Sequence, residues 1–172
     1  MKIACVTLQE RGGTDQLLYK VAGHLQSRGM YLAGIIKDVD YASRFGNGCD
    51  MKVRVLPDGP VIKITQNLGK GSDACRLDPG AIARAVVSVE SGSLDSADLF
   101  ILNKFGPEEA AGRGFCSVIG DAICRDIPVL VGVGGASRAA FDSFTGGLAP
   151  ALLPQMQAIL EWFYDEGPQV RQ

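Results

Sequence analysis

The sequence has little of what metal centres and histidine-based catalysis require. Its 172 residues include one histidine, His24, and five cysteines, with no CxxC pair. A single imidazole removes most multi-histidine metal sites from consideration and leaves His24, inside a predicted helix, as the one imidazole for any histidine-based triad. An odd number of cysteines, with no secretory signal before them, predicts reduced thiols in a cytoplasmic protein.

Long hydrophobic runs and an excess of one charge are also missing. The longest apolar run, residues 127–133, is far shorter than the roughly 20 residues that cross a bilayer. The net charge of −2 supplies no basic face for nucleic acid. We therefore expect neither a membrane nor nucleic acid as a partner. Hydrophobic residues make up 47% of the chain, which fits one globular domain over residues 1–172.

Short apolar runs alternate with segments of helical periodicity along most of the chain. The predicted strands are residues 1–7, 31–36, 98–103 and 128–133, and the predicted helices are residues 14–27, 79–91, 107–125 and 151–164. This alternation is typical of an α/β protein. We predict a three-layer, doubly wound and mainly parallel sheet.

A different pattern interrupts this alternation at about residues 45–70. Residues 51–56 and 61–66 read as strands on either side of the turn sequence Pro57-Asp58-Gly59-Pro60. They predict a β-hairpin inserted into the α/β core. Asp78 follows as a predicted helix cap, with Pro79 at the first helical position.

The first strand–helix turn, residues 7–14, partly matches the phosphate-loop pattern G-x-x-x-x-G-K-[ST]. Gly12 and Thr14 match, whereas Thr7 replaces the first glycine and Gly13 replaces the lysine. Backbone N–H groups at a helix start can still face an anion. The candidate ligand-binding residues are Gln9, Glu10, Arg11, Gly12, Gly13, Thr14 and Asp15.

The missing lysine removes a charge-assisted contact worth about 1.5–3 kcal/mol, which Arg11 could partly replace. The alternative interpretation is an ordinary strand–turn–helix connection that uses glycines and a threonine cap for structural reasons. The octapeptide leaves both interpretations open.

The strand at residues 98–103 ends in Asn103-Lys104, where phosphate-loop hydrolases carry acidic residues that hold magnesium. Asparagine can coordinate or hydrogen-bond a ligand but contributes no charge, and lysine repels a cation but could neutralise a bound anion. Asn103 and Lys104 are therefore further candidate ligand-binding residues. The alternative is a solvated lysine beside a turn. Arg76, Arg113 and Lys104 are the candidates for an oxyanion clamp, because guanidinium groups pair with oxyanions in a bidentate manner.

Two further features have alternative interpretations. Cys49 and Cys75 flank the predicted hairpin; a thiolate near Arg76 would be reactive, whereas a buried cysteine would act as a small hydrophobe. Trp162 and Phe163 either dock the last helix or form the face of a homodimer.

Several segments together resemble a bacterial family of unknown function. They are residues 48–51, 66–72, 75–80, 103–106 and 112–115, together with Glu109. The resemblance covers nearly the whole chain. It implies a phosphate-loop-like α/β fold, and members of that family are often encoded beside molybdate-transport genes.

More distantly, the layout is similar to small nucleoside-triphosphatases with a P-loop, a hairpin insertion and an Asp-Glu-Ile-Gly acidic motif. Residues 7–14 match the phosphate loop, except that its lysine is missing. Residues 103–106 match the acidic motif, except that both of its acids are missing. This predicts a protein with a degenerate P-loop that binds a small anionic ligand, either ATP or GTP with magnesium or an oxyanion such as phosphate or molybdate. Hydrolysis is expected to be weak or absent.

Two other functions remain open from the sequence. One is an active nucleoside-triphosphatase in which Lys104 or Arg11 replaces the missing lysine. The other is an interaction or regulatory module that has lost its ligand.

Overall fold

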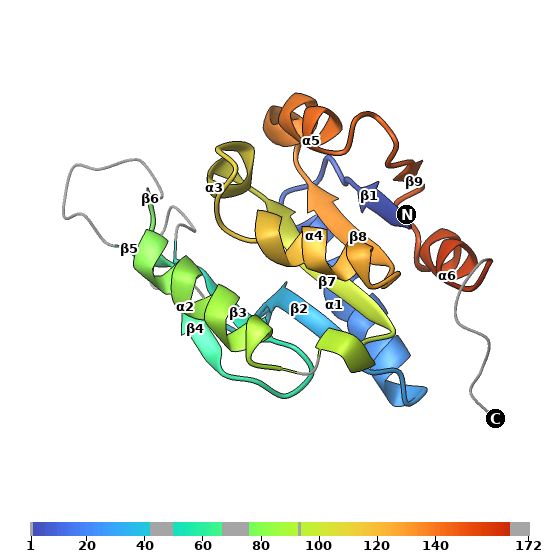
Figure 1. The fold of residues 1–172 in the computed structure, drawn as a ribbon, viewed down its shortest axis with the longest axis horizontal. Coiled ribbons are helices and arrows are strands. Elements are labelled where there is room, and N and C mark those ends of the chain that lie inside the picture. Colours follow the sequence, from blue (N-terminus) through green and yellow to red (C-terminus); the bar gives the residue numbers. More distant parts are fainter. Residues whose placement is uncertain (1, 42–49, 67–75, 93, 166–172) are drawn as a thin grey trace.

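A seven-stranded sheet organises the computed structural model, which describes residues 2–41, 50–66, 76–92 and 94–165 (Figure 1). The strand order is β4-β3-β2-β7-β8-β1-β9. The mutually parallel strands are β1 (Ile3–Val6), β2 (Leu32–Lys37), β7 (Leu99–Phe105), β8 (Val129–Val133) and β9 (Ala151–Leu152). The predicted mainly parallel sheet is confirmed.

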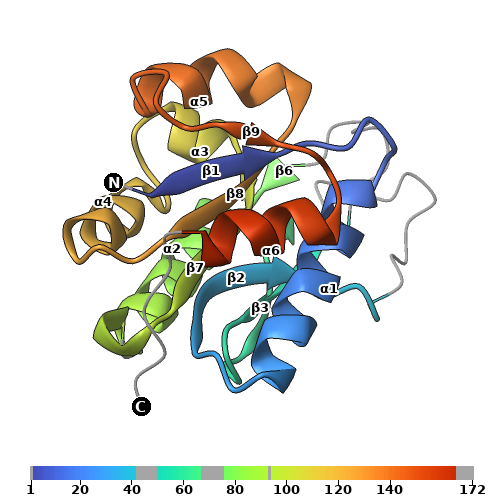
Figure 2. The same cartoon turned by 90° about the vertical axis from the view of Figure 1, so that its right-hand side faces the viewer.

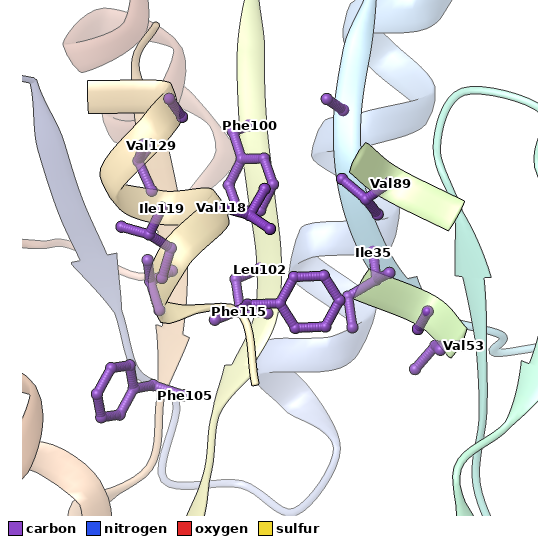
Figure 3. Close-up of a cluster of buried hydrophobic side chains, with 14 of the residues drawn as sticks. Ile35, Val53, Val89, Phe100, Leu102, Phe105, Phe115, Val118, Ile119 and Val129 are labelled. Carbon is purple, nitrogen blue, oxygen red and sulfur yellow. The ribbon is translucent and has the colours of Figure 1, made fainter. Parts of the chain in front are cut away.

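Helices cover both faces of this sheet (Figure 2). α1 (Gly13–Ser27) and α6 (Met156–Tyr164) pack on one face, where Leu99 and Ile101 of β7 belong to the same apolar cluster. α2 (Pro79–Glu90) and α4 (Cys116–Cys124) cover the opposite face, which includes Phe100 and Leu102 (Figure 3). Alternating residues of a buried strand thus serve two cores, which makes the three layers.

The predicted hairpin is present and extends the sheet at one edge. β3 (Lys52–Val55) pairs antiparallel with β2 and with β4 (Val61–Lys63). The expected strand at 61–66 breaks at Ile64, whose N–H donates to the Met51 carbonyl over 3.0 Å while its carbonyl accepts from Asp78 N–H.

The chain then leaves the main sheet. β5 (Thr65–Gln66) pairs with β6 (Arg76–Leu77) in a separate two-stranded sheet. Residues 42–49 and 67–75 of the predicted insertion lie outside the described residues.

The predicted helix over residues 107–125 is wrong, because the chain forms α3 (Pro107–Ala110) and then α4. The intervening residues form a turn in which Gly112 and Gly114 have positive φ. The prediction for Asp78 is confirmed: its carboxylate caps α2 by accepting the N–H groups of Gly80 and Ala81.

The predicted helix over residues 151–164 begins too early, since residues 151–152 form β9. The Pro150 carbonyl accepts the Cys5 N–H over 2.9 Å, which lays this segment along β1 before α6 starts. The sequence also left α5 (Arg138–Phe144) unassigned. In α6, Phe163 is 1% exposed in the α1 layer and Lys2 Nζ lies 5.4 Å from the Trp162 ring centroid, so both aromatics dock the helix.

Within the part of the chain that the structure describes, no helix combines the length and apolar character needed to span a membrane.

Candidate functional site

The β1–α1 turn lies at the carboxyl end of the parallel strands, the edge where open α/β sheets bind ligands. Gly12 precedes α1 with φ +78° and caps it without a side chain. The Gly13 N–H donates to the Glu10 carbonyl over 3.0 Å, and the Leu8 N–H donates to Thr14 Oγ1 over 2.9 Å. The turn is therefore stabilised by one backbone hydrogen bond and by the hydroxyl of Thr14.

Several backbone N–H groups of this turn have no acceptor in the described part of the protein, and three of them lie at the start of α1. Among the described residues, the N–H groups of Gly12, Thr14 and Asp15 donate to no protein acceptor. Unpaired N–H groups at the start of a helix carry a partial positive charge. Donors of this kind, without a partner in the protein, can bind a small anion.

A cavity of about 440 Å³ lies against the turn and the first turns of α1. Ligand pockets commonly span about 300–1,000 Å³. Its wall combines turn residues with charged and apolar side chains: Leu8, Glu10, Arg11, Gly12, Gly13, Asp15, Gln16, Leu17, Lys20, Lys37, Val39, Tyr41 and Pro154. The basic residues Arg11, Lys20 and Lys37 outnumber the acidic ones.

A closed polar network ties α1 to the ends of β2 and β7 beside this cavity. Asn103 Nδ2 donates to Asp15 Oδ1 over 2.9 Å, and Asn103 Oδ1 accepts the Lys37 N–H over 2.9 Å. Lys37 Nζ completes it by pairing with Asp15 Oδ2 over 3.0 Å. We call Asp15, Lys37 and Asn103 the polar triangle. Asn103 is 3% exposed, so its side chain acts as an internal connector.

The P-loop fold implies magnesium, and the residues at this edge do not fit it. Both oxygens of Asp15 accept N–H donors, and one donor is the ammonium of Lys37, which repels a cation. The side-chain oxygen of Asn103 already accepts the Lys37 N–H. Across the described residues, no three His, Cys, Asp or Glu side chains cluster as metal ligands would.

Tyr41 forms part of the cavity wall, and both its hydroxyl and its ring contact other side chains. Its hydroxyl donates to the carboxylate of Asp50, a side chain that is 1% exposed and pairs with Lys63 Nζ over 2.9 Å. Lys52 Nζ lies 4.1 Å from the Tyr41 ring centroid. These contacts fix an aromatic ring in the cavity.

The structure gathers only part of the predicted site. Of the turn residues, Glu10 to Gly13 and Asp15 line the cavity, Thr14 braces the turn, and Gln9 is exposed outside the lining. Asn103 does not line the cavity but contacts Asp15 and Lys37, which do, while Lys104 is exposed and does not line it.

Of the two arginines of the expected oxyanion clamp, Arg113 is not brought to the cavity. Arg113 is exposed and donates to both carboxylate oxygens of Glu108, which holds the pKa of Glu108 below its usual range. The side chain of Arg76 lies outside the described residues, as do Cys49 and Cys75.

Sequence reasoning missed Lys20, Lys37, Val39 and Tyr41, which all line the cavity. Lys37 had a usable signal, because it directly follows the strand predicted at residues 31–36. Polar residues at the carboxyl ends of neighbouring parallel strands meet at one edge of the sheet.

The segment that follows β7 is a second turn at this edge, and we call residues 106–115 the Glu109 turn. The buried Glu109 carboxylate accepts the Gly106 N–H over 2.9 Å and the Phe115 N–H over 3.0 Å. Gly114 has φ +58°, and a Cβ there would overlap Glu109 Oε1. Residues 103–106 and 112–115 are two of the segments on which the family resemblance is based, and the Glu109 turn gives most of these residues a structural role.

The fold places the chain among α/β proteins with a mostly parallel sheet of the P-loop nucleoside-triphosphatase fold type. It is similar to a solved structure titled as that of a human cancer-related nucleoside triphosphatase, with a TM-score of 0.68 over 98% of this chain and 100% of that chain. The sequence identity is 13%, so this likeness concerns the fold.

The chain belongs to the family described as protein of unknown function DUF2478, which matches residues 3–162. It is also 34% identical, over 172 residues, to the molybdenum import ATP-binding protein ModC 2 of Bradyrhizobium diazoefficiens. The match covers 99% of this chain and 19% of that protein, so the chain spans about a fifth of that relative's length. The expected membership of a family of unknown function is confirmed.

Proposed function

We propose that this protein binds a nucleotide or a tetrahedral oxyanion in the cavity beside the β1–α1 turn, with weak or absent hydrolysis. The observation that carries the proposal is the set of N–H groups of Gly12, Thr14 and Asp15, which have no acceptor among the described residues, at a cavity wall that also holds Lys20 and Lys37. Such an arrangement stabilises negative charge.

A nucleotide is favoured over a bare oxyanion by the shape and lining of the cavity. Its volume of about 440 Å³ exceeds what one tetrahedral ion needs, and Val39 and the fixed ring of Tyr41 offer an apolar wall for a base. The names of the similar proteins, an ATP-binding protein and a nucleoside triphosphatase, support the same choice.

Molybdate is the second candidate ligand. The similar Bradyrhizobium protein is named for molybdenum import, and the expected gene neighbourhood of the family points the same way. The basic side chains Arg11, Lys20 and Lys37 suit a divalent oxyanion as well as a phosphate group.

Weak or absent hydrolysis follows from the polar triangle. A P-loop hydrolase uses acids at the end of the strand equivalent to β7 to hold magnesium and to orient water. Here Asn103 is buried, with its side chain hydrogen-bonded to Asp15 and to the Lys37 N–H, and Asp15 is paired with Lys37. An active nucleoside-triphosphatase would have to use Lys37 or Arg11 for the missing lysine, since Lys104 does not line the cavity.

A cytoplasmic location agrees with these ligands and with the thiols. Cys5, Cys116 and Cys124 are unpaired in the described part of the chain. A homodimer stays a prediction.

Thermal unfolding with ATP, GTP, phosphate and molybdate tests the proposal. A ligand that binds only the native state at 100 times its Kd stabilises it by about 2.7 kcal/mol, which raises the Tm. Calorimetry then gives the Kd, and a phosphate-release assay measures turnover. Lys20→Ala should weaken binding, whereas Arg84→Ala, an exposed charge on α2, should not.

A Tm that is unchanged by all four ligands at millimolar concentration would contradict the proposal and favour the interaction module. Rapid phosphate release that survives Lys37→Ala and Arg11→Ala would contradict the predicted weakness of hydrolysis and both substitute-lysine mechanisms.

A further inference from the structure

We infer that this site binds its anion without a divalent cation, because the ammonium of Lys37 supplies the positive charge that magnesium supplies in P-loop hydrolases. The inference rests on the proposed anion-binding function. It adds that the Lys37 ammonium is the cation of the site and that the ligand binds as the metal-free anion.

The position of Lys37 is the first support. Its Nζ lies 3.0 Å from Asp15 Oδ2, and Asp15 directly follows Thr14 in the first turn of α1. Lys37 and Asp15 both line the cavity that Gly12 and Gly13 line. The ammonium is therefore held by α1 at the same cavity as the unpaired N–H groups.

The ammonium also has hydrogen-bonding capacity to spare. A lysine ammonium carries three donors, and the structure shows one directed to Asp15. The Lys37 side chain keeps 31% of its surface exposed, so the remaining donors can reach a ligand in the cavity. Asp15 orients the ammonium and prevents the side chain from turning away into solvent.

The two departures from the phosphate-loop hydrolase pattern at this site together amount to an exchange of charged residues between positions. The lysine is missing from position 13 of the turn, but a lysine enters the same cavity from the end of β2 as Lys37. The expected acid is missing at position 103, and an acid stands instead at position 15. An acid at 103 would face the Asp15 carboxylate, whereas the Asn103 amide donates to it.

This exchange specifies the form of the ligand. A site that neutralises phosphate with Lys37, Lys20 and Arg11 recognises the free anion, while a magnesium complex presents a cation to the Lys37 ammonium. We therefore expect the site to favour a free monophosphate or oxyanion over a magnesium-bound triphosphate.

Calorimetry of the full chain with AMP and with inorganic phosphate, in EDTA or in excess magnesium chloride, tests the inference. The wild-type Kd should agree within about twofold between the two conditions, because no metal takes part. Lys37→Met should weaken binding roughly 10- to 100-fold in both, the size expected for a lost charge-assisted contact. Lys37→Arg should retain most of the affinity, and Arg84→Ala, which removes a remote exposed charge, should retain all of it.

An exchange variant sharpens the test. Lys37→Met combined with N103D removes the ammonium and adds a second carboxylate beside Asp15, so magnesium should now tighten phosphate binding at least tenfold relative to EDTA. A melting curve for each variant checks that it is folded.

Wild-type binding that requires magnesium, or a folded Lys37→Met variant with unchanged affinity, would overturn the inference and leave the proposed function standing. No wild-type binding of AMP or phosphate in either condition, when ATP, GTP or molybdate does bind, would overturn the inference alone. No binding of any of these ligands would overturn the proposed function itself. The wild-type comparison alone decides the inference if Lys37→Met does not fold.

Discussion

Two turns at the same edge of the sheet use glycine and a carboxylate in opposite ways. In the Glu109 turn, the buried carboxylate accepts the N–H groups of Gly106 and Phe115, so the turn is closed around its own anion. In the β1–α1 turn, the Asp15 carboxylate contacts Lys37 and Asn103 instead, and the neighbouring N–H groups remain unpaired. The first arrangement stabilises the fold, and the second leaves N–H donors that can bind a ligand.

The glycines of the two turns differ in the same sense. A Cβ at Gly114 would overlap the Glu109 carboxylate, whereas a Cβ at Gly12 would meet no atom within 4 Å. Both have positive φ. Matching backbone conformations therefore do not imply matching roles, and the surroundings of each glycine decide what it does.

The largest expected effect comes from breaking the closed turn. Gly114→Ala should lower the free energy of unfolding by about 3–5 kcal/mol, because backbone strain adds to the displacement of Glu109 from two buried N–H groups. Gly12→Ala is the matched control and should cost only about 1–2 kcal/mol, the strain alone. Urea unfolding measures both, and equal losses would contradict the contrast between the turns.

The next effect comes from the polar triangle. Asn103→Asp should destabilise the protein by about 1.5–3 kcal/mol at neutral pH, because it removes the donor to Asp15 and adds a like charge. Lys104→Ala, at the exposed neighbouring residue, should stay within about 0.5 kcal/mol. A stable Asn103→Asp protein would show that the triangle does not constrain this site.

A smaller effect is expected at Thr14. Thr14→Val should cost about 1 kcal/mol in urea unfolding, because the Leu8 N–H loses its acceptor. Thr14→Ser keeps the hydroxyl and should retain most of the stability. A valine variant as stable as the wild type would contradict this role of the Thr14 hydroxyl.

The smallest effect concerns Cys116, whose thiol donates to the Glu109 carbonyl. Burial, with the nearby Glu109 charge, raises the pKa of this thiol, so its thiolate fraction at any given pH is lower than that of an ordinary cysteine. In a variant that keeps only this cysteine, the alkylation rate of the folded protein should rise at a higher pH than the rate of the same protein unfolded in urea. A folded-state profile that coincides with the profile in urea, or lies at lower pH, would contradict a closed Glu109 turn.

Local sequence patterns predicted the parallel strands, α1 and the capped start of α2 well, since periodicity and capping are properties of neighbouring residues. They failed at residues 107–125 because the break depends on the Glu109 carboxylate, whose hydrogen bonds appear only after the chain turns back. They also missed β9, a two-residue strand that exists through its pairing with β1.

The candidate site divides in the same way. The β1–α1 turn was recognised from its own residues, and part of it lines the cavity. Lys37 was missed because its role depends on β2 lying next to β7, and Tyr41 because Asp50 holds it from a distant part of the fold. Spatial neighbours set by topology are not visible in a local pattern.

An amide NMR titration of the full chain with AMP compares the two turns within one sample. The account predicts that the N–H signals of Gly12, Thr14 and Asp15 shift on saturation, while those of Gly106 and Phe115, already bonded to Glu109, stay in place. Unmoved signals at Gly12 to Asp15, with shifts elsewhere in the protein, would contradict it.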